Sequence, residues 1–329
     1  MKKSFDHGEP RMSDKRLVVG GKVEEDPIVR KVIEIYAKAY PEEKPVRNPR
    51  EATRVLRERF KLLVDEDLVT LVYASFIEGR PVLFEGPPGT GKTEVGEALL
   101  TLWAGRRAFV LPCSENYDEY RVIGDFHPLK AYKYGFNEES FIPRPLLSAM
   151  ILDSGVLIDE IRRSSEEFQN LLLDIIDKRR IIVPELKRVY TARGVGFQII
   201  FTSNPEDLAQ NELSDAFLRR VIRVRFDYPP PHRELEIPRL RLGNAASLIP
   251  EEYMKLGVDV VSRLRRSELL YKPGVSDTVK WMELSAKIAA LRGKKKVDCR
   301  DVVEAARASL VKRCEEEEIV MSVVREFFG

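Results

Sequence analysis

The chain has 329 residues, of which 43% are hydrophobic, so it is long enough for one large or two ordinary domains with a buried core. Its 55 lysines and arginines nearly balance its 53 aspartates and glutamates, and the net charge of +2 gives no general argument for binding nucleic acid or a membrane surface. No apolar run is long enough to cross a membrane, and the charged N-terminus lacks the apolar core of a signal peptide. The three cysteines, Cys113, Cys299 and Cys314, are too scattered for a disulfide framework or a zinc site, so we expect a cytoplasmic protein.

The first part of the chain, residues 1–50, is polar and contains several prolines, and we expect an N-terminal extension that is partly helical. One helix is predicted over residues 26–40, with Asp26 as its N-cap and Pro27 at the first helical position. A second helix is predicted over residues 64–79, where a glycine ends it.

From residue 81 to 228, apolar strand-like segments alternate with amphipathic helix-like ones, such as residues 165–180. The strand-like segments are RPVLFE (80–85), RAFVLPC (107–113), SGVLIDE (154–160), GFQIIFTS (196–203) and RVIRVRFDY (220–228). This alternation predicts a parallel sheet covered by helices on both faces, and we assign residues 51–230 to this α/β domain.

The three consecutive prolines that follow Tyr228 interrupt this pattern. Beyond them we find no strand signal, and the helix-patterned segments are residues 251–270, 276–293, 298–314 and 316–328. We therefore predict a small all-helical domain over residues 231–329.

A glycine-rich segment, GPPGTGKT at residues 86–93, lies between the first predicted strand and a helix-like segment and fits the pattern G-x-x-x-x-G-K-[ST]. Its glycines let the backbone approach a phosphate, and successive N–H groups at the helix start face the anion. In this pattern Lys92 reaches the outer phosphates and the Thr93 hydroxyl binds Mg²⁺. The predicted ATP-binding residues are Gly86, Pro87, Pro88, Gly89, Thr90, Gly91, Lys92, Thr93 and Glu94. The alternative is a turn that merely joins a strand to a helix.

Two carboxylates, Asp159 and Glu160, end another apolar strand-like segment. Ligands of open parallel sheets bind where the strands end, so Asp159 can hold Mg²⁺ together with Thr93. Glu160 can then act as the general base that polarises the attacking water. The alternative is that both residues only cap the segment that follows, where acidic side chains are common.

Two further positions are candidates for catalysis. Asn204 ends the segment FTSN, where its amide can help to place the water beside Glu160; as an isolated residue it would instead be a turn former before Pro205. Arg219 and Arg220 follow in LSDAFLRR, either as partners of nearby acids or as an arginine finger that stabilises charge on the transferred phosphoryl group.

In this order, and followed by a helical domain, GPPGTGKT, VLIDEI, FTSNP and LSDAFLRR resemble the motifs of an AAA+ ATPase. The resemblance covers about residues 60–312 and is greatest to the MoxR branch, near its CoxD-like members. The segments that carry it are GRPVLFEGPPGTGKTEV, RPLLSAM, LLLDIIDKRRIIVP and NELSDAFLRRVIRVRFDYP. Asn204 then matches the sensor 1 position, and Arg219 or Arg220 matches the finger that reaches into a neighbouring subunit.

The resemblance implies a P-loop AAA+ fold with a helical lid and Mg²⁺-dependent hydrolysis of ATP. It also implies an oligomeric ring, expected to be a hexamer, that remodels or matures a partner protein. In this branch the partner commonly contains a von Willebrand factor A domain. The rival interpretations are a nucleic-acid-associated AAA+ motor or restriction-type NTPase, and a nucleotide-gated scaffold with little turnover.

Three segments remain open at this level. AAA+ lids often carry a sensor 2 arginine where this chain has Ser276, Asp277 and Thr278, and Lys280 is the basic residue nearby. The long tyrosine-rich segment 114–144 resembles the place of a helix 2 insertion, and we expect either a surface that touches a partner polypeptide or a covering loop. RGKKK at residues 292–296 is expected to be a solvated turn between lid helices, with a nucleic-acid patch as the alternative.

Overall fold

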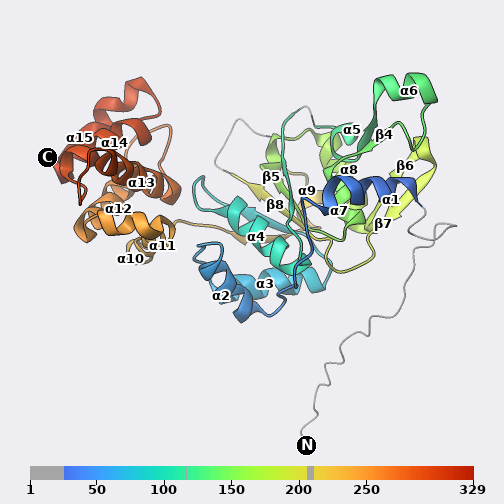
Figure 1. The fold of residues 1–329 in the computed structure, drawn as a ribbon, viewed down its shortest axis with the longest axis horizontal. Coiled ribbons are helices and arrows are strands. Elements are labelled where there is room, and N and C mark those ends of the chain that lie inside the picture. Colours follow the sequence, from blue (N-terminus) through green and yellow to red (C-terminus); the bar gives the residue numbers. More distant parts are fainter. Residues whose placement is uncertain (1–25, 116, 206–210) are drawn as a thin grey trace, which may run out of the picture.

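The computed structural model describes residues 26–115, 117–205 and 211–329, so the first 25 residues of the expected N-terminal extension lie outside the described part. An α/β domain is followed by a helical domain that stands beside it, and one connector after strand β9 runs between the two (Figure 1). The succession of an α/β domain and a helical domain agrees with the prediction from the sequence.

The central sheet has five strands in the order β2-β5-β8-β1-β9, and all neighbouring pairs are parallel. The strands are β1 (Val82–Glu85), β2 (Phe109–Pro112), β5 (Val156–Asp159), β8 (Ile199–Ser203) and β9 (Ile222–Arg225). Each lies within one of the predicted strand-like segments. Because the strands run in the same direction, the residues that follow β1, β5 and β8 meet at one edge of the sheet, where a ligand binds in such folds.

Helices cover both faces of the sheet, and the central strands β1, β5 and β8 are therefore buried along nearly their whole length. In β5, Leu157 packs into one core together with helices α2 (Pro49–Glu58), α3 (Glu66–Ile77) and α4 (Lys92–Ala104). Its neighbours Val156 and Ile158 pack into the opposite core, against α1 (Pro27–Val32), α7 (Pro145–Ile151) and α8 (Glu166–Lys178).

The helix predicted over residues 26–40 is present as α1 and the π-helical turn Ile33–Ala37 that continues it. The Asp26 side chain caps α1 by accepting a hydrogen bond from the backbone N–H of Ile28 at 2.8 Å. Beyond the helix, the ring of Tyr40 stacks on that of Phe109 in the edge strand β2, with 4.4 Å between the ring centroids. This N-terminal segment therefore covers one end of the α/β domain.

The segment 114–144 forms a two-stranded antiparallel hairpin, with β3 (Gly124–Phe126) paired to β4 (Phe141–Pro143). It also carries α5 (Glu119–Val122) and α6 (Pro128–Tyr134). A second hairpin, β6 (Arg180–Val183) with β7 (Arg188–Thr191), follows α8. Neither hairpin was predicted. Further along the chain, the short helix α9 (Asp215–Leu218) precedes β9.

The C-terminal domain is helical throughout and has its own core around the buried Trp281, whose indole N–H donates to the carbonyl oxygen of Val302 at 2.9 Å. Its helices are α10 (Pro231–Glu234), α11 (Glu236–Leu242), α12 (Glu251–Arg265), α13 (Val275–Leu291), α14 (Cys299–Ser309) and α15 (Glu317–Phe328). Within the described part of the chain, the helices are too short or too polar to cross a bilayer.

Candidate functional site

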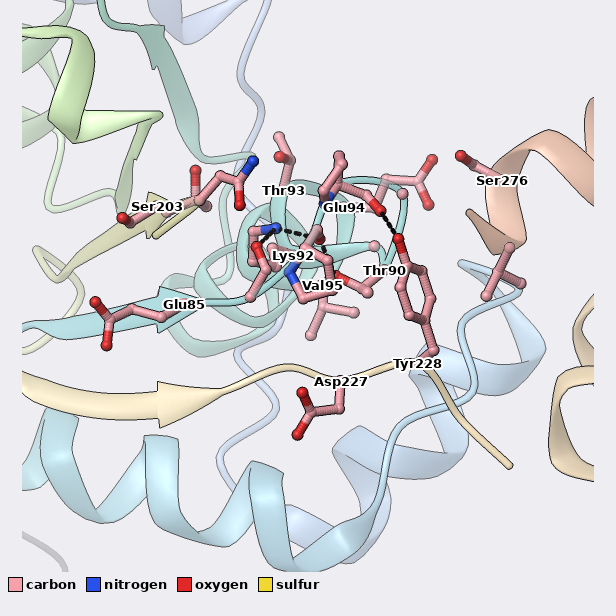
Figure 2. A pocket seen from close by; sticks show the side chains of 18 of the residues that line it. Glu85, Thr90, Lys92, Thr93, Glu94, Val95, Ser203, Asp227, Tyr228 and Ser276 are labelled. Carbon is pink, nitrogen blue, oxygen red and sulfur yellow. Dashed lines mark hydrogen bonds between the residues drawn. The ribbon is translucent and has the colours of Figure 1, made fainter. Parts of the chain in front are cut away.

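The glycine-rich segment joins the end of β1 to the start of α4, which begins at Lys92. Gly89 and Gly91 adopt φ values of +73° and +88°, a conformation that favours glycine because it has no Cβ. Lys92 is only 9% exposed, and its ammonium donates to the carbonyl oxygens of Gly86 and Pro87, each at 2.7 Å (Figure 2). A cation is therefore held at the centre of the loop, where an anion would be bound.

A group of oxygen atoms lies next to this loop, where α4 meets the end of β5. The Thr93 hydroxyl donates to Oδ1 of Asp159 at 2.8 Å, and the Thr202 hydroxyl donates to the same oxygen at 2.5 Å. One hydroxyl and one carboxylate on adjacent elements are the few hard oxygen donors that Mg²⁺ takes from a protein, with water and phosphate completing its shell. The residues present therefore fit the ion that the fold implies.

Glu160 occupies a strained position directly after Asp159. Its backbone is left-handed, with φ 55° and ψ 52°, which costs about 1–3 kcal/mol for a residue other than glycine. Its backbone N–H donates to the Thr202 hydroxyl at 2.9 Å, and its carboxylate is paired with Nε of Arg163 at 2.5 Å. Thr202 and Arg163 thus hold Glu160 from two sides.

Two of the residues that orient the site were missed from the sequence. Thr202 is 1% exposed in the middle of an apolar strand, where a hydroxyl gives no pattern of its own. Arg163 lies three residues after Glu160, and the i,i+3 spacing of opposite charges is the signal that would have identified it.

Most of the predicted site residues converge on one cleft with a volume of about 1630 Å³ between the two domains. All nine predicted residues of the glycine-rich segment line it, as do Asp159, Glu160 and Asn204. The helical domain contributes Ile237, Arg241, Tyr271, Ser276 and Lys280, among others, and residues 61–63 contribute from the segment before α3. Figure 2 shows Ser276 facing the loop that bears Thr90 and the first turn of α4, which bears Glu94. The cleft is thus large, and lined by both domains.

The helical domain touches the glycine-rich loop directly. A Cβ on Gly89 would lie 2.9 Å from Cα of Gly274, so the two backbones are in close contact. Arg241 forms an ion pair with Glu94 at the start of α4. Among the residues considered for sensor 2, Ser276 and Lys280 line the cleft, whereas Asp277 is buried and caps α13 by accepting from the backbone N–H of Gly274 at 2.8 Å.

Arg219 and Arg220, which follow α9, lie apart from the other predicted site residues. Neither Arg219 nor Arg220 is among the described residues that line the cleft. Arg220 donates from Nε to Oδ1 of Asp177 at 2.8 Å, and this hydrogen bond raises the pKa of Arg220. The side chain of Arg219 is exposed. Neither of them completes the cleft of its own chain.

Comparison with known proteins agrees with this geometry. Residues 81–221 match the family model of the AAA domain, dynein-related subfamily. The gas vesicle ATPase GvpN of Ancylobacter aquaticus is 27% identical over 230 residues, which cover 65% of this chain and 62% of GvpN. The protein NorQ of Paracoccus denitrificans is 25% identical over 173 residues, which cover 52% of this chain and 61% of NorQ. The chain thus spans less than two thirds of the length of these relatives.

A solved structure, the Holliday junction branch migration motor RuvB of Thermotoga maritima, is 14% identical and covers 74% of this chain and 67% of its own, with a TM-score of 0.46. The sheet, the P-loop and the family match together define the class: the α/β domain is an AAA+ ATPase domain. Within that class, the resemblance to MoxR-type AAA+ ATPases predicted from the sequence is confirmed.

Proposed function

We propose that the protein hydrolyses ATP in this cleft, in a reaction that depends on Mg²⁺. The observation that supports this most is the convergence of Lys92, Thr93, Asp159 and Glu160 at the edge of the sheet where β1, β5 and β8 end. An anion-binding loop, a pair of oxygens that can bind a metal ion and a carboxylate beside them are the parts that phosphoryl transfer to water requires.

Each residue has a distinct role in this proposal. The backbone N–H groups of the glycine-rich loop and Lys92 bind the phosphates. Thr93 and Asp159 would hold Mg²⁺, which would neutralise charge on the phosphate oxygens. Glu160 accepts the proton of the attacking water, and Asn204, at the end of the neighbouring strand, orients that water. Thr202 keeps both acidic residues in place through its two hydrogen bonds.

The proposal extends to a ring of identical subunits. Arg219 and Arg220 lie outside the cleft of their own chain, so an arginine finger at this position has to act on a neighbour. Head-to-tail contacts of this kind close into rings when the rotation between subunits permits. A hexamer that remodels a partner protein, with a von Willebrand factor A domain as the expected partner module, follows from the MoxR-type resemblance.

The test is phosphate release from ATP, measured with Mg²⁺ and again with excess EDTA. We expect turnover in the first condition only. Lys92→Ala should bind ATP more weakly in calorimetry, because the variant lacks the ammonium that contacts the β- and γ-phosphates. Its circular dichroism spectrum should match that of the wild type. Lys130→Ala, on the exposed face of α6, is the matched control. Wild-type affinity in Lys92→Ala would refute the assignment of the loop.

A further inference from the structure

The connector between the two domains carries a tyrosine that reaches the tip of the glycine-rich loop. Tyr228 follows β9, and its hydroxyl donates to the carbonyl oxygen of Pro88 at 2.9 Å (Figure 2). Pro88 and Gly89 lie in the turn of this loop and are called its tip here, and Gly89 needs its positive φ to make the turn. A hydrogen bond to this carbonyl therefore acts on the conformation of the phosphate-binding turn itself.

The ring of Tyr228 is in turn held by the helical domain. Arg265, the last residue of α12, places its guanidinium carbon 4.1 Å from the centroid of the Tyr228 ring. A cation over an aromatic face at this distance is an attractive contact that is stronger when it is shielded from water, and the Arg265 side chain is only 11% exposed.

Arg265 has little freedom to move away from this position. Its guanidinium forms a bidentate ion pair with the carboxylate of Glu234, in which one N–O distance is 2.9 Å. The Glu234 side chain is only 1% exposed. Its Nε also donates to the carbonyl oxygen of Pro273 at 2.9 Å. The guanidinium is thus fixed by three separate elements: the connector, α10 and the turn before α13.

The turn before α13 makes a second contact with the same loop. Gly274 follows Pro273, and a Cβ on Gly274 would lie 2.8 Å from Cα of Gly89. Arg265 therefore holds two of the groups that touch the loop tip, the Tyr228 phenol on Pro88 and the Gly274 backbone on Gly89. A shift of the helical domain would change both contacts together.

We propose that Tyr228 and Arg265 form a latch through which the position of the helical domain sets the conformation of the phosphate-binding loop and so controls nucleotide release. The inference rests on the proposed function, because it assigns to these residues the regulation of the ATP site. Tyr228 is a positioning residue in this scheme. It does not take part in bond breaking, so its loss should change how long ADP stays bound and leave the hydrolytic step unaltered.

The test compares Tyr228→Phe with the wild-type protein, using a fluorescent ADP analogue in stopped-flow displacement and single-turnover hydrolysis of ATP. Tyr228→Phe keeps the ring beneath Arg265 and removes only the hydroxyl. We expect ADP release to accelerate by about fivefold, the equivalent of one ordinary hydrogen bond, with an unchanged single-turnover rate. Tyr253→Phe is the matched control, since its hydroxyl contacts Cys299 within the helical domain.

A second variant tests the other contact without touching the phenol. Gly274→Ala keeps an ordinary backbone conformation, with φ −100°, but its Cβ pushes the turn away from Gly89. We expect faster ADP release here as well.

Unchanged ADP release in both variants, or a lower melting temperature as their only effect, would overturn the latch while leaving the ATPase proposal intact. Failure of the wild-type protein to bind ADP or ATP would overturn the proposed function, and the latch with it.

Discussion

The hydroxyl of Thr202 donates a hydrogen bond to Oδ1 of Asp159 at 2.5 Å. The same hydroxyl accepts a hydrogen bond from the backbone N–H of Glu160, the residue that stands next to Asp159 in a left-handed conformation. One buried side chain on β8 therefore positions both acidic residues at the end of β5. The strand that bears Asn204 thus contributes to the site through its interior as well as through its end.

Replacing Thr202 by valine should lower the turnover of ATP by about 10- to 100-fold, because a hydrogen bond to a charged group contributes about 1.5–3 kcal/mol. Valine has nearly the same shape, so the side-chain packing around β8 should be retained. Thr202→Ser retains the hydroxyl and should keep most of the activity. Thr191→Val, on the exposed edge of a hairpin, serves as the control. Equal kcat values for Thr202→Val and the wild type would show that the hydroxyl has no positioning role.

Glu160→Gln tests the general base. The amide keeps the size of the side chain but cannot accept the proton of water, so hydrolysis should slow by about 10²- to 10⁴-fold while ATP binding is retained. Steady-state phosphate release and calorimetry measure the two properties separately, and Glu185→Gln is a control distant from the cleft. A rate within a few-fold of wild type would show that Glu160 is not the general base and only caps the segment after β5.

The variants Arg219→Ala and Arg220→Ala test which of the two residues is the arginine finger. Arg220 is engaged with Asp177, and the exposed Arg219 is the better placed of the two to meet another subunit. We therefore expect Arg219→Ala to lose turnover by about 10³-fold or more with ATP binding intact, and Arg220→Ala to lose much less.

Mixing is the decisive measurement for the ring. Arg219→Ala mixed with Lys92→Ala should regain part of the activity, because an intact cleft then meets an intact arginine at some interfaces. Specific activity of the wild type should also rise with protein concentration as rings assemble. Full activity of both arginine variants, independent of concentration, would contradict a finger that acts between subunits.

The three cysteines should differ sharply in reactivity. Cys113 is buried behind the site, and burial, together with the nearby carboxylates of Asp159 and Glu160, raises its pKa to about 12. Cys299 and Cys314 are exposed. Because the thiolate is the reactive form and the raised pKa keeps Cys113 protonated at pH 8, Ellman's reagent should label the two exposed thiols quickly and Cys113 only after unfolding. Rapid labelling of all three in the native protein would show that Cys113 is accessible.

Much of the α/β domain was predictable because its strands are continuous apolar runs. VLFE, VLID and IIFTS are buried on both faces, so their composition identifies them without knowledge of their partners. The hairpins β3–β4 and β6–β7 were missed because their short strands mix buried residues with partly or fully exposed ones, so that no continuous apolar run marks them. Helix α2 was missed as well, since half of the residues in PREATRVLRE are charged and only Ala52 and Leu56 are buried.

The residues of the site also divide into those that the sequence predicted and those that it did not. Lys92, Thr93 and Asp159 belong to motifs whose spacing reflects local backbone geometry, so a single sequence reveals them. Thr202 and Tyr228 act through contacts with residues 43 and 140 positions away, and no local pattern records such a pairing. Likewise, nothing in the local sequence distinguishes Arg265 from the other charged residues at the end of its amphipathic helix.

The packing of the N-terminal segment has a practical consequence. The stacked pair Tyr40–Phe109 and the bridge between Glu42 and Arg106 cover the outer strand β2, which has no strand partner on its far side in the described sheet. A fragment that begins at residue 51 would expose the ring of Phe109 and the free edge of β2. Bare edges with apolar side chains recruit other chains. Poor solubility is therefore the first defect expected of such a fragment, well before any loss of nucleotide affinity.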